Sequence, residues 1–130
     1  MEIEVTTTRN TISGDHKATV LVESINPSEL IYAVECRATL SGAPWGRGVG
    51  VDVLADDLQT DSGVYELPTP AQSFSFDVES SELLSGDGTY RITVYVRDSR
   101  GVWDDTFLFI PSGSDMLKTA DGKVFKCKRG

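Results

Sequence analysis

Strict alternation of apolar and polar residues is the feature that most constrains the fold of this chain. The segment 89–97 reads TYRITVYVR, and its inward-facing residues are predicted to be Tyr90, Ile92, Val94 and Val96. Successive side chains of a β-strand point to opposite faces of the sheet, so this pattern indicates a strand with one buried face. No segment shows a 3.6-residue period over ten or more residues, which argues against helices. The chain is therefore predicted to be all-β.

Further segments of the same kind recur at intervals of about 8–12 residues. They are residues 3–8, 17–25, 31–40, 49–54, 73–78 and 102–110. Within 31–40, Glu35, Arg37 and Thr39 fall on one side, which we expect to be solvated. Residues 55–70 are acidic, end in two prolines, and are predicted to be an irregular excursion. About seven short strands with this spacing favour an antiparallel β-sandwich.

Charge is divided unevenly along the chain. The 130 residues carry a net charge of −8, yet residues 115–130 hold five basic and two acidic residues, a net of +3. Residues 1–114 hold the remaining seven basic and 18 acidic residues, a net of −11. An acidic body argues against binding nucleic acid, because phosphate contacts need clustered Lys and Arg. No apolar run approaches the ~18 residues that a membrane-spanning helix needs.

The charge boundary suggests the domain organisation. One sandwich domain is predicted over residues 1–110, a linker over 111–114 and a basic C-terminal arm or β-hairpin over 115–130. The arm mixes cationic and apolar side chains, which suits docking on an acidic protein surface. It could add a strand to a partner's sheet or fold back on its own acidic domain. The predicted partner-binding residues are Leu117, Lys118, Lys123, Val124, Phe125, Lys126, Lys128 and Arg129.

Three segments, in order, resemble the bacterial Ig-like domain family. Residues 31–44 (IYAVECRATLSGAP) are similar to its third strand and turn, 72–77 (QSFSFD) to its "Y-S-F-S-W-D" strand, and 87–101 (DGTYRITVYVRDSRG) to its closing hairpin. The resemblance covers about residues 12–110 and does not extend to the arm. It implies an immunoglobulin-like β-sandwich of the kind found on surface proteins, secreted enzymes and phage virions. Fold alone does not imply function, because such modules serve many roles.

Catalytic and metal-binding patterns are weak in this sequence. The single histidine, His16, lies in a predicted turn with no nucleophile motif beside it, and the protein is predicted to be neither an enzyme nor dependent on a cofactor. Cys36 and Cys127 lack metal-site spacing, and both are expected to be reduced. Calcium bound by loop carboxylates is a minor alternative to solvated acidic loops. The carboxylates concerned are Asp52, Asp56, Asp57 and Asp61, or Asp98, Asp104 and Asp105.

Two tryptophans are candidate ligand-facing residues. Trp45 lies in a glycine-rich corner, and Trp103 begins the last predicted strand. Tryptophans on loops can stack on sugars or anchor a protein partner. Alternatively, Trp103 covers one end of the core and Trp45 packs on a neighbouring loop.

These observations favour a non-catalytic structural or accessory component of a larger assembly. Its most specific form is a bacteriophage virion protein, a capsid decoration or tail component docked on capsid or tail subunits through the arm. The start at Met1 lacks a secretory signal pattern, which favours a protein that is not exported. The alternative is an extracellular adhesion or carbohydrate-binding module of a bacterial surface protein, with a host-surface glycan as ligand.

Overall fold

The computed structural model describes residues 1–7, 17–79 and 88–111. They form the strands β1 (Ile3–Thr7), β2 (Lys17–Ser24), β3 (Ile31–Leu40), β4 (Val51–Asp52), β5 (Tyr65–Ala71), β6 (Ser73–Glu79), β7 (Thr89–Arg97) and β8 (Trp103–Pro111), and the 3-10 helix η1 (Asp56–Leu58). Eight strands are thus described, whereas the spacing of the alternating segments predicts about seven. The predicted arm, 115–130, lies outside the described residues, as do residues 112–114 of the predicted linker.

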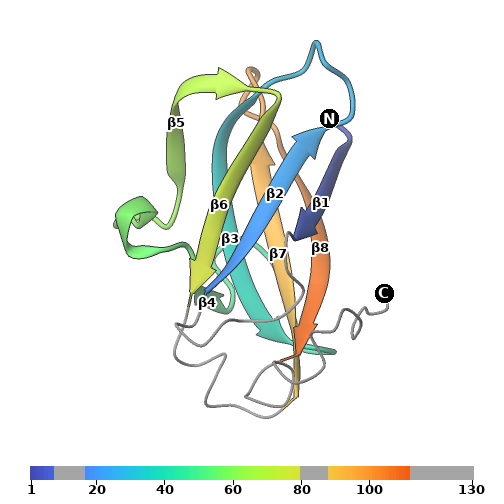
Figure 1. Cartoon of the computed structure of the whole chain (residues 1–130), viewed down its shortest axis with the longest axis vertical. Helices are drawn as coiled ribbons and strands as arrows, with labels where there is room; N and C mark the ends of the chain where they lie inside the picture. Colours follow the sequence, from blue (N-terminus) through green and yellow to red (C-terminus); the bar gives the residue numbers. More distant parts are fainter. Residues whose placement is uncertain (8–16, 80–87, 112–130) are drawn as a thin grey trace.

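The strands form two antiparallel sheets. The smaller has the order β1-β2-β6, and the larger has the order β4-β3-β7-β8 with β5 also paired to β3. In Figure 1, β1, β2 and β6 lie over β3, β7 and β8. For the described residues, the prediction of an antiparallel β structure in two sheets is confirmed. Among the described residues, no helix is long and apolar enough to span a membrane.

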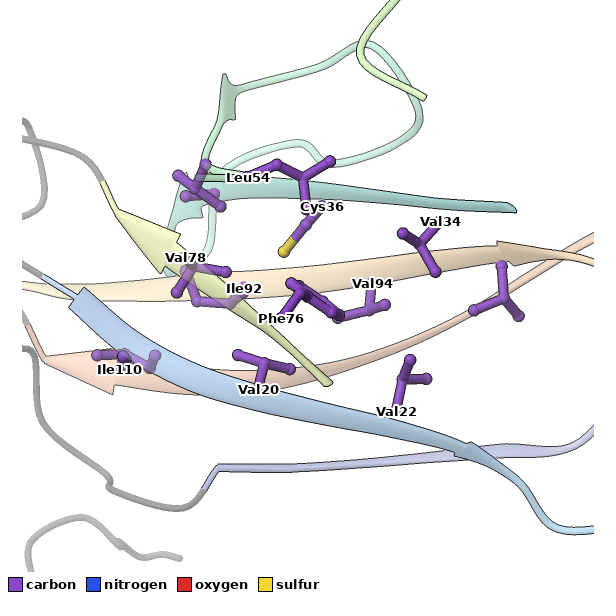
Figure 2. Close-up of a cluster of buried hydrophobic side chains, with 14 of the residues drawn as sticks. Val20, Val22, Val34, Cys36, Leu54, Phe76, Val78, Ile92, Val94 and Ile110 are labelled. Carbon is purple, nitrogen blue, oxygen red and sulfur yellow. The ribbon is translucent and has the colours of Figure 1, made fainter. Parts of the chain in front are cut away.

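The hydrophobic core fills the space between the two sheets. Each central strand contributes every second side chain, as the alternation predicts. The fully or almost fully buried members include Val20 and Val22 of β2, Val34 and Cys36 of β3, Phe76 and Val78 of β6, Ile92 and Val94 of β7, and Ile110 of β8. Figure 2 shows these side chains gathered between the strands. Removing their apolar surface from water is the main force that holds the sheets together.

Two predicted boundaries are wrong. Residues 55–70 are not wholly irregular, because this part of the chain contains η1 and all of β5 except its last residue. Strand β5 contains Pro68 and Pro70, and proline occurs in strands at a sheet edge, where its missing N–H breaks no ladder. The predicted strand 49–54 shrinks to β4, Val51–Asp52. Beyond β4, Leu54 bridges to Val78 of β6 and so links the two sheets.

The turn between β7 and β8 is held by one carboxylate. Asp98 accepts hydrogen bonds from the backbone N–H of Arg100 (2.8 Å) and of Val102 (3.0 Å). It also accepts one from the Arg100 guanidinium at 2.8 Å. Gly101 has a φ of 83°, a conformation that favours glycine. The hairpin that the resemblance of residues 87–101 implies is present between β7 and β8. The Arg100 bond is the main reason that the pKa of Asp98 falls to about 2.

Candidate functional site

The outer face of the larger sheet, turned away from the core, carries an ordered set of polar and aromatic side chains. Pairing of β3, β7 and β8 places these residues in cross-strand rows. Glu35, Tyr95 and Asp105 form one row, and Arg37, Thr93 and Phe107 form the next. The rows on either side are Ala33, Arg97 and Trp103, and Thr39, Arg91 and Phe109. Residues of one row that lie on adjacent strands are within side-chain contact distance of each other.

Glu35 is the buried centre of this face. Its side chain is only 2% exposed. The carboxylate accepts hydrogen bonds from Nε of Arg47 at 2.9 Å, from Nε of Arg37 at 3.0 Å and from the backbone N–H of Gly48 at 3.1 Å. A buried carboxylate is stable only when it is paired and hydrogen-bonded in this way.

The pKa of Glu35 reflects the balance between burial and these partners. Burial is the largest single influence and acts to raise the pKa. Together, the hydrogen bonds from Arg47, Arg37 and Gly48 lower the pKa by more than burial raises it, so the pKa lies below its ordinary value. Glu35 therefore stays ionised at neutral pH, and its role is to bind Arg47, Arg37 and Gly48 rather than to exchange a proton.

Residues 41–50, which we call the covering loop, lie on the outer face. Trp45 of this loop reaches Arg91 near one end of the sheet, and Arg47 reaches Glu35 and Trp103 nearer the other. Arg37 reinforces the attachment by donating to the carbonyl oxygen of Gly50 at 3.3 Å. The loop thus crosses the sheet diagonally and is fastened at both ends.

A glycine allows the covering loop to approach the sheet closely. Gly50 has a φ of 86°, and a Cβ at this position would lie 2.4 Å from the carbonyl oxygen of Ala38. It would also lie 2.6 Å from Cγ2 of Thr39. No other residue type fits this contact without moving the β3 backbone.

The expectation that this side of the strand 31–40 is solvated is wrong for two of its three residues. Glu35 is 2% exposed and Thr39 is 8% exposed, although Arg37 is partly exposed. On the neighbouring strand, Thr93 and Tyr95 of this face are also buried. The reason is tertiary, because the covering loop comes from beyond the strand and lies over the face.

Within the described part of the chain, two hydroxyl groups on this face are buried without a hydrogen-bond partner. They are Oγ1 of Thr39 and the phenolic oxygen of Tyr95. Tyr95 is 4% exposed, and burial raises its pKa. Buried polar atoms usually have partners, so these two hydroxyl groups depart from the usual pattern.

Trp103 is part of the outer face and is largely covered. The Arg47 guanidinium stacks on its ring at 3.7 Å from the centroid, and Arg97 approaches the same ring at 5.8 Å. Arg97 is itself paired with Glu66 of β5 at 3.1 Å. Trp103 lies in the outer-face row of Arg97 rather than among the core residues, so it does not cover an end of the core.

Trp45 belongs to a separate, exposed group that we call the aromatic–arginine patch: Trp45, Arg91, Phe107 and Phe109. The Arg91 guanidinium lies 3.8 Å from the centroid of Trp45 and 3.8 Å from that of Phe107. Phe107 meets Phe109 edge-on, with the centroids 5.4 Å apart. The three rings remain between 43% and 47% exposed, which is unusual for large apolar side chains.

The other sequence-predicted residues are not brought together into a metal site. Asp98 is taken up by its turn, Asp104 accepts from the Met1 amine at 3.0 Å, and Asp52 accepts from the N–H of Leu54 at 3.1 Å. In the described ranges 1–7, 17–79 and 88–111, no group of three or more His, Cys, Asp or Glu side chains could hold a metal ion.

The two cysteines, the histidine and the predicted arm residues are placed as follows. Cys36 is buried in the core, and burial raises the pKa of its thiol well above the ordinary value. His16 and Cys127 lie outside the described residues, and so do the eight predicted arm residues from Leu117 to Arg129.

Arg91, Phe107 and Phe109 are the residues that sequence reasoning missed as a site. The signal is present in β8, where both alternating positions are apolar: Leu108 and Ile110 on one side, Phe107 and Phe109 on the other. A strand with one buried face needs only one apolar side. The second apolar side therefore indicates a surface with its own purpose.

No protein-family model matches the sequence, and no curated protein matches it.

Proposed function

We propose that this protein is a non-catalytic β-sandwich module that binds another protein within a larger assembly, through the aromatic–arginine patch. The carrying observation is that three half-exposed aromatic rings and an arginine form one continuous group on a sheet face. Tryptophan, phenylalanine and arginine are enriched at protein interfaces, and tryptophan and arginine dominate their binding energy.

The rigidity of the outer face supports this proposal. The loop that carries Trp45 is fastened by the buried carboxylate of Glu35 through Arg47 and Gly48. The strands that carry Arg91, Phe107 and Phe109 pair along their full length. A surface that is already ordered loses little conformational entropy on binding, which favours affinity.

We also infer an immunoglobulin-like topology. The orders β1-β2-β6 and β3-β7-β8 correspond to strands A-B-E and C-F-G of an immunoglobulin sandwich. The resemblance of three segments to bacterial Ig-like domains supports the same assignment. In this chain, β5 pairs with β3 rather than with β6.

The more specific form of the proposal is a bacteriophage virion protein, a capsid decoration or tail component whose basic arm, 115–130, contributes to attachment. It is supported by the family resemblance and by the opposite net charges of arm and body, +3 and −11. Deletion of residues 115–130 should reduce incorporation into particles, and unchanged incorporation would contradict a role for the arm. Neighbouring capsid or tail genes would support the virion assignment.

The role of the aromatic–arginine patch can be tested in the cells in which the protein is naturally produced. A tagged wild-type chain should sediment with a complex much larger than the monomer, and the double variant Phe107→Ser, Phe109→Ser should sediment as a monomer. Ile25→Ser is the matched control, because Ile25 is 51% exposed in a turn away from the patch, against 46% for Phe109. Monomeric wild-type protein, or equal sedimentation of all variants, would contradict the proposal.

The carbohydrate-binding alternative makes a different prediction. It requires a glycan to quench Trp45 fluorescence with saturation, because Trp45 is 47% exposed while Trp103 lies under Arg47. Saturable quenching by a neutral glycan, lost in Trp45→Ala, would favour that alternative over protein binding.

A further inference from the structure

We propose that Arg91 is a specificity residue that binds a carboxylate, an Asp or Glu side chain flanked by apolar residues, on the protein partner. This inference rests on the proposed function and gives the patch a defined ligand chemistry. It follows from how Arg91 is held, from which of its nitrogens are in use, and from the charge of the surrounding molecule.

The Arg91 guanidinium is fixed before any partner arrives. It lies between the rings of Trp45 and Phe107, at 3.8 Å from each centroid. Its Nε donates to Oγ1 of Thr93 at 3.0 Å, and Thr93 is buried. Stacking on two rings and one hydrogen bond to the sheet define both the plane and the direction of the group.

The two terminal nitrogens of Arg91 are left to bind a ligand. Among the described residues, Arg37 and Arg47 pair with Glu35, Arg97 pairs with Glu66, and Arg100 pairs with Asp98. In this same part of the chain, Arg91 has no carboxylate partner. A guanidinium held by its Nε and its faces still presents a pair of N–H donors, which matches the two oxygens of a carboxylate.

The surroundings favour a single carboxylate over a polyanion. The protein carries a net charge of −8, and Asp105 is exposed on the same face, two residues before Phe107. A nucleic acid or polyphosphate would be repelled by this field, whereas one carboxylate close to Arg91 gains more from the local contact. The adjoining rings of Phe107 and Phe109 offer apolar area, so we expect apolar residues beside the acid.

The test uses the purified full-length chain and a displayed library of random dodecapeptides. Peptides selected by the wild type are expected to share an Asp or Glu next to Leu, Ile, Phe or Trp. The most enriched peptide is then synthesised together with a twin in which that acid is the corresponding amide. Isothermal titration should show about tenfold or greater weakening for the twin, as expected for a lost charge-assisted hydrogen bond.

Protein variants give the second arm of the test. Arg91→Gln should weaken the acidic peptide about tenfold or more but leave the affinity for the amide twin nearly unchanged. Ile25→Ser should bind both peptides as the wild type does. If Arg91→Gln does not fold, the amide twin still tests the carboxylate on the wild-type chain, and Phe109→Ser tests the apolar rim.

Several outcomes overturn the inference. They are a selection without an acidic consensus, equal affinity for acid and amide, and Arg91-dependent binding of uronic or sialic acid oligosaccharides that exceeds the peptide's affinity. Loss of the acidic preference together with intact patch-dependent sedimentation would refute this inference alone. Retention of the acidic preference by a chain that never enters an assembly would refute the proposed function alone.

Discussion

Replacement of Glu35 by alanine is the sharpest test of how the outer face is held together. The substitution removes one carboxylate that is 2% exposed and accepts three hydrogen bonds, from Arg47, Arg37 and Gly48. It leaves the Gly48 N–H without its acceptor and two arginines facing each other over the sheet. We expect the covering loop to detach from the sheet.

The expected cost can be worked from these contacts. Removing one partner of a buried ion pair destabilises a protein by about 3–5 kcal/mol. Arg47 is 42% exposed, so its charge can be hydrated again once Glu35 is gone. Arg37 is only 16% exposed, so the cost reaches the upper part of that range only if Arg37 stays in its buried position. A loss of about 3–5 kcal/mol is a large share of the ~5–15 kcal/mol that stabilises a typical domain.

The assay is urea unfolding, followed by both tryptophan fluorescence and far-ultraviolet circular dichroism. The control is Glu66→Ala, which removes an ion pair to Arg97 from a carboxylate that is 67% exposed. Such exposed pairs contribute about 0.2–1 kcal/mol. Trypsin supplies a local readout, because a detached loop should be cleaved after Arg47 at protease concentrations that leave the wild type intact. If Glu35→Ala and Glu66→Ala cost the same, and both cost less than about 1 kcal/mol, the reasoning is refuted.

Three further predictions concern pH, thiol reactivity and surface charge. Folding lowers the pKa values of Glu35 and Asp98. The two carboxylates should therefore stabilise the folded protein fully above about pH 4.5, and this stabilisation should be lost as the pH falls toward 2. Thermal melts that show the same stability across this pH range would contradict the prediction. Cys36 should resist thiol reagents at pH 8 in a variant without the second cysteine until urea unfolds the chain, and rapid labelling of the native protein would be the opposite result. Glu4 lies directly opposite Glu23, so Glu4→Lys should stabilise the protein by about 0.2–1 kcal/mol in low salt, and by much less in 1 M salt.

The inner half of the fold was predictable because its pattern is local. In β3, β6 and β7, alternation alone assigns the strand and identifies the buried side, and Val34, Phe76 and Ile92 are in the core as expected. Because side chains alternate between the two faces of a strand, an apolar set at every second residue determines which face is buried. The turn at Asp98 also follows from local sequence, because its carboxylate and Gly101, which determine the turn, lie within five consecutive residues.

The outer half was not predictable, because it depends on a loop that returns over the sheet. Nothing near Glu35 in sequence shows that Arg47 will cover it, and an isolated Glu on a strand is normally solvated. Strand β5 was missed for a different reason, since two prolines argue against a strand unless it lies at an edge. The patch around Arg91 depends on the register between β7 and β8, which places Phe107 diagonally across from that arginine.

The prolines of β5 also bear on how densely such molecules can be crowded. Pro68 and Pro70 offer no N–H groups along the edge strand that pairs with β3, so a strand from another copy would find no regular ladder there to extend. Exposed edges with regular hydrogen-bonding groups are the usual starting points of aggregation. The β5 edge therefore does not favour the addition of strands from other copies. Many copies could be held close together without their sheets merging through this edge.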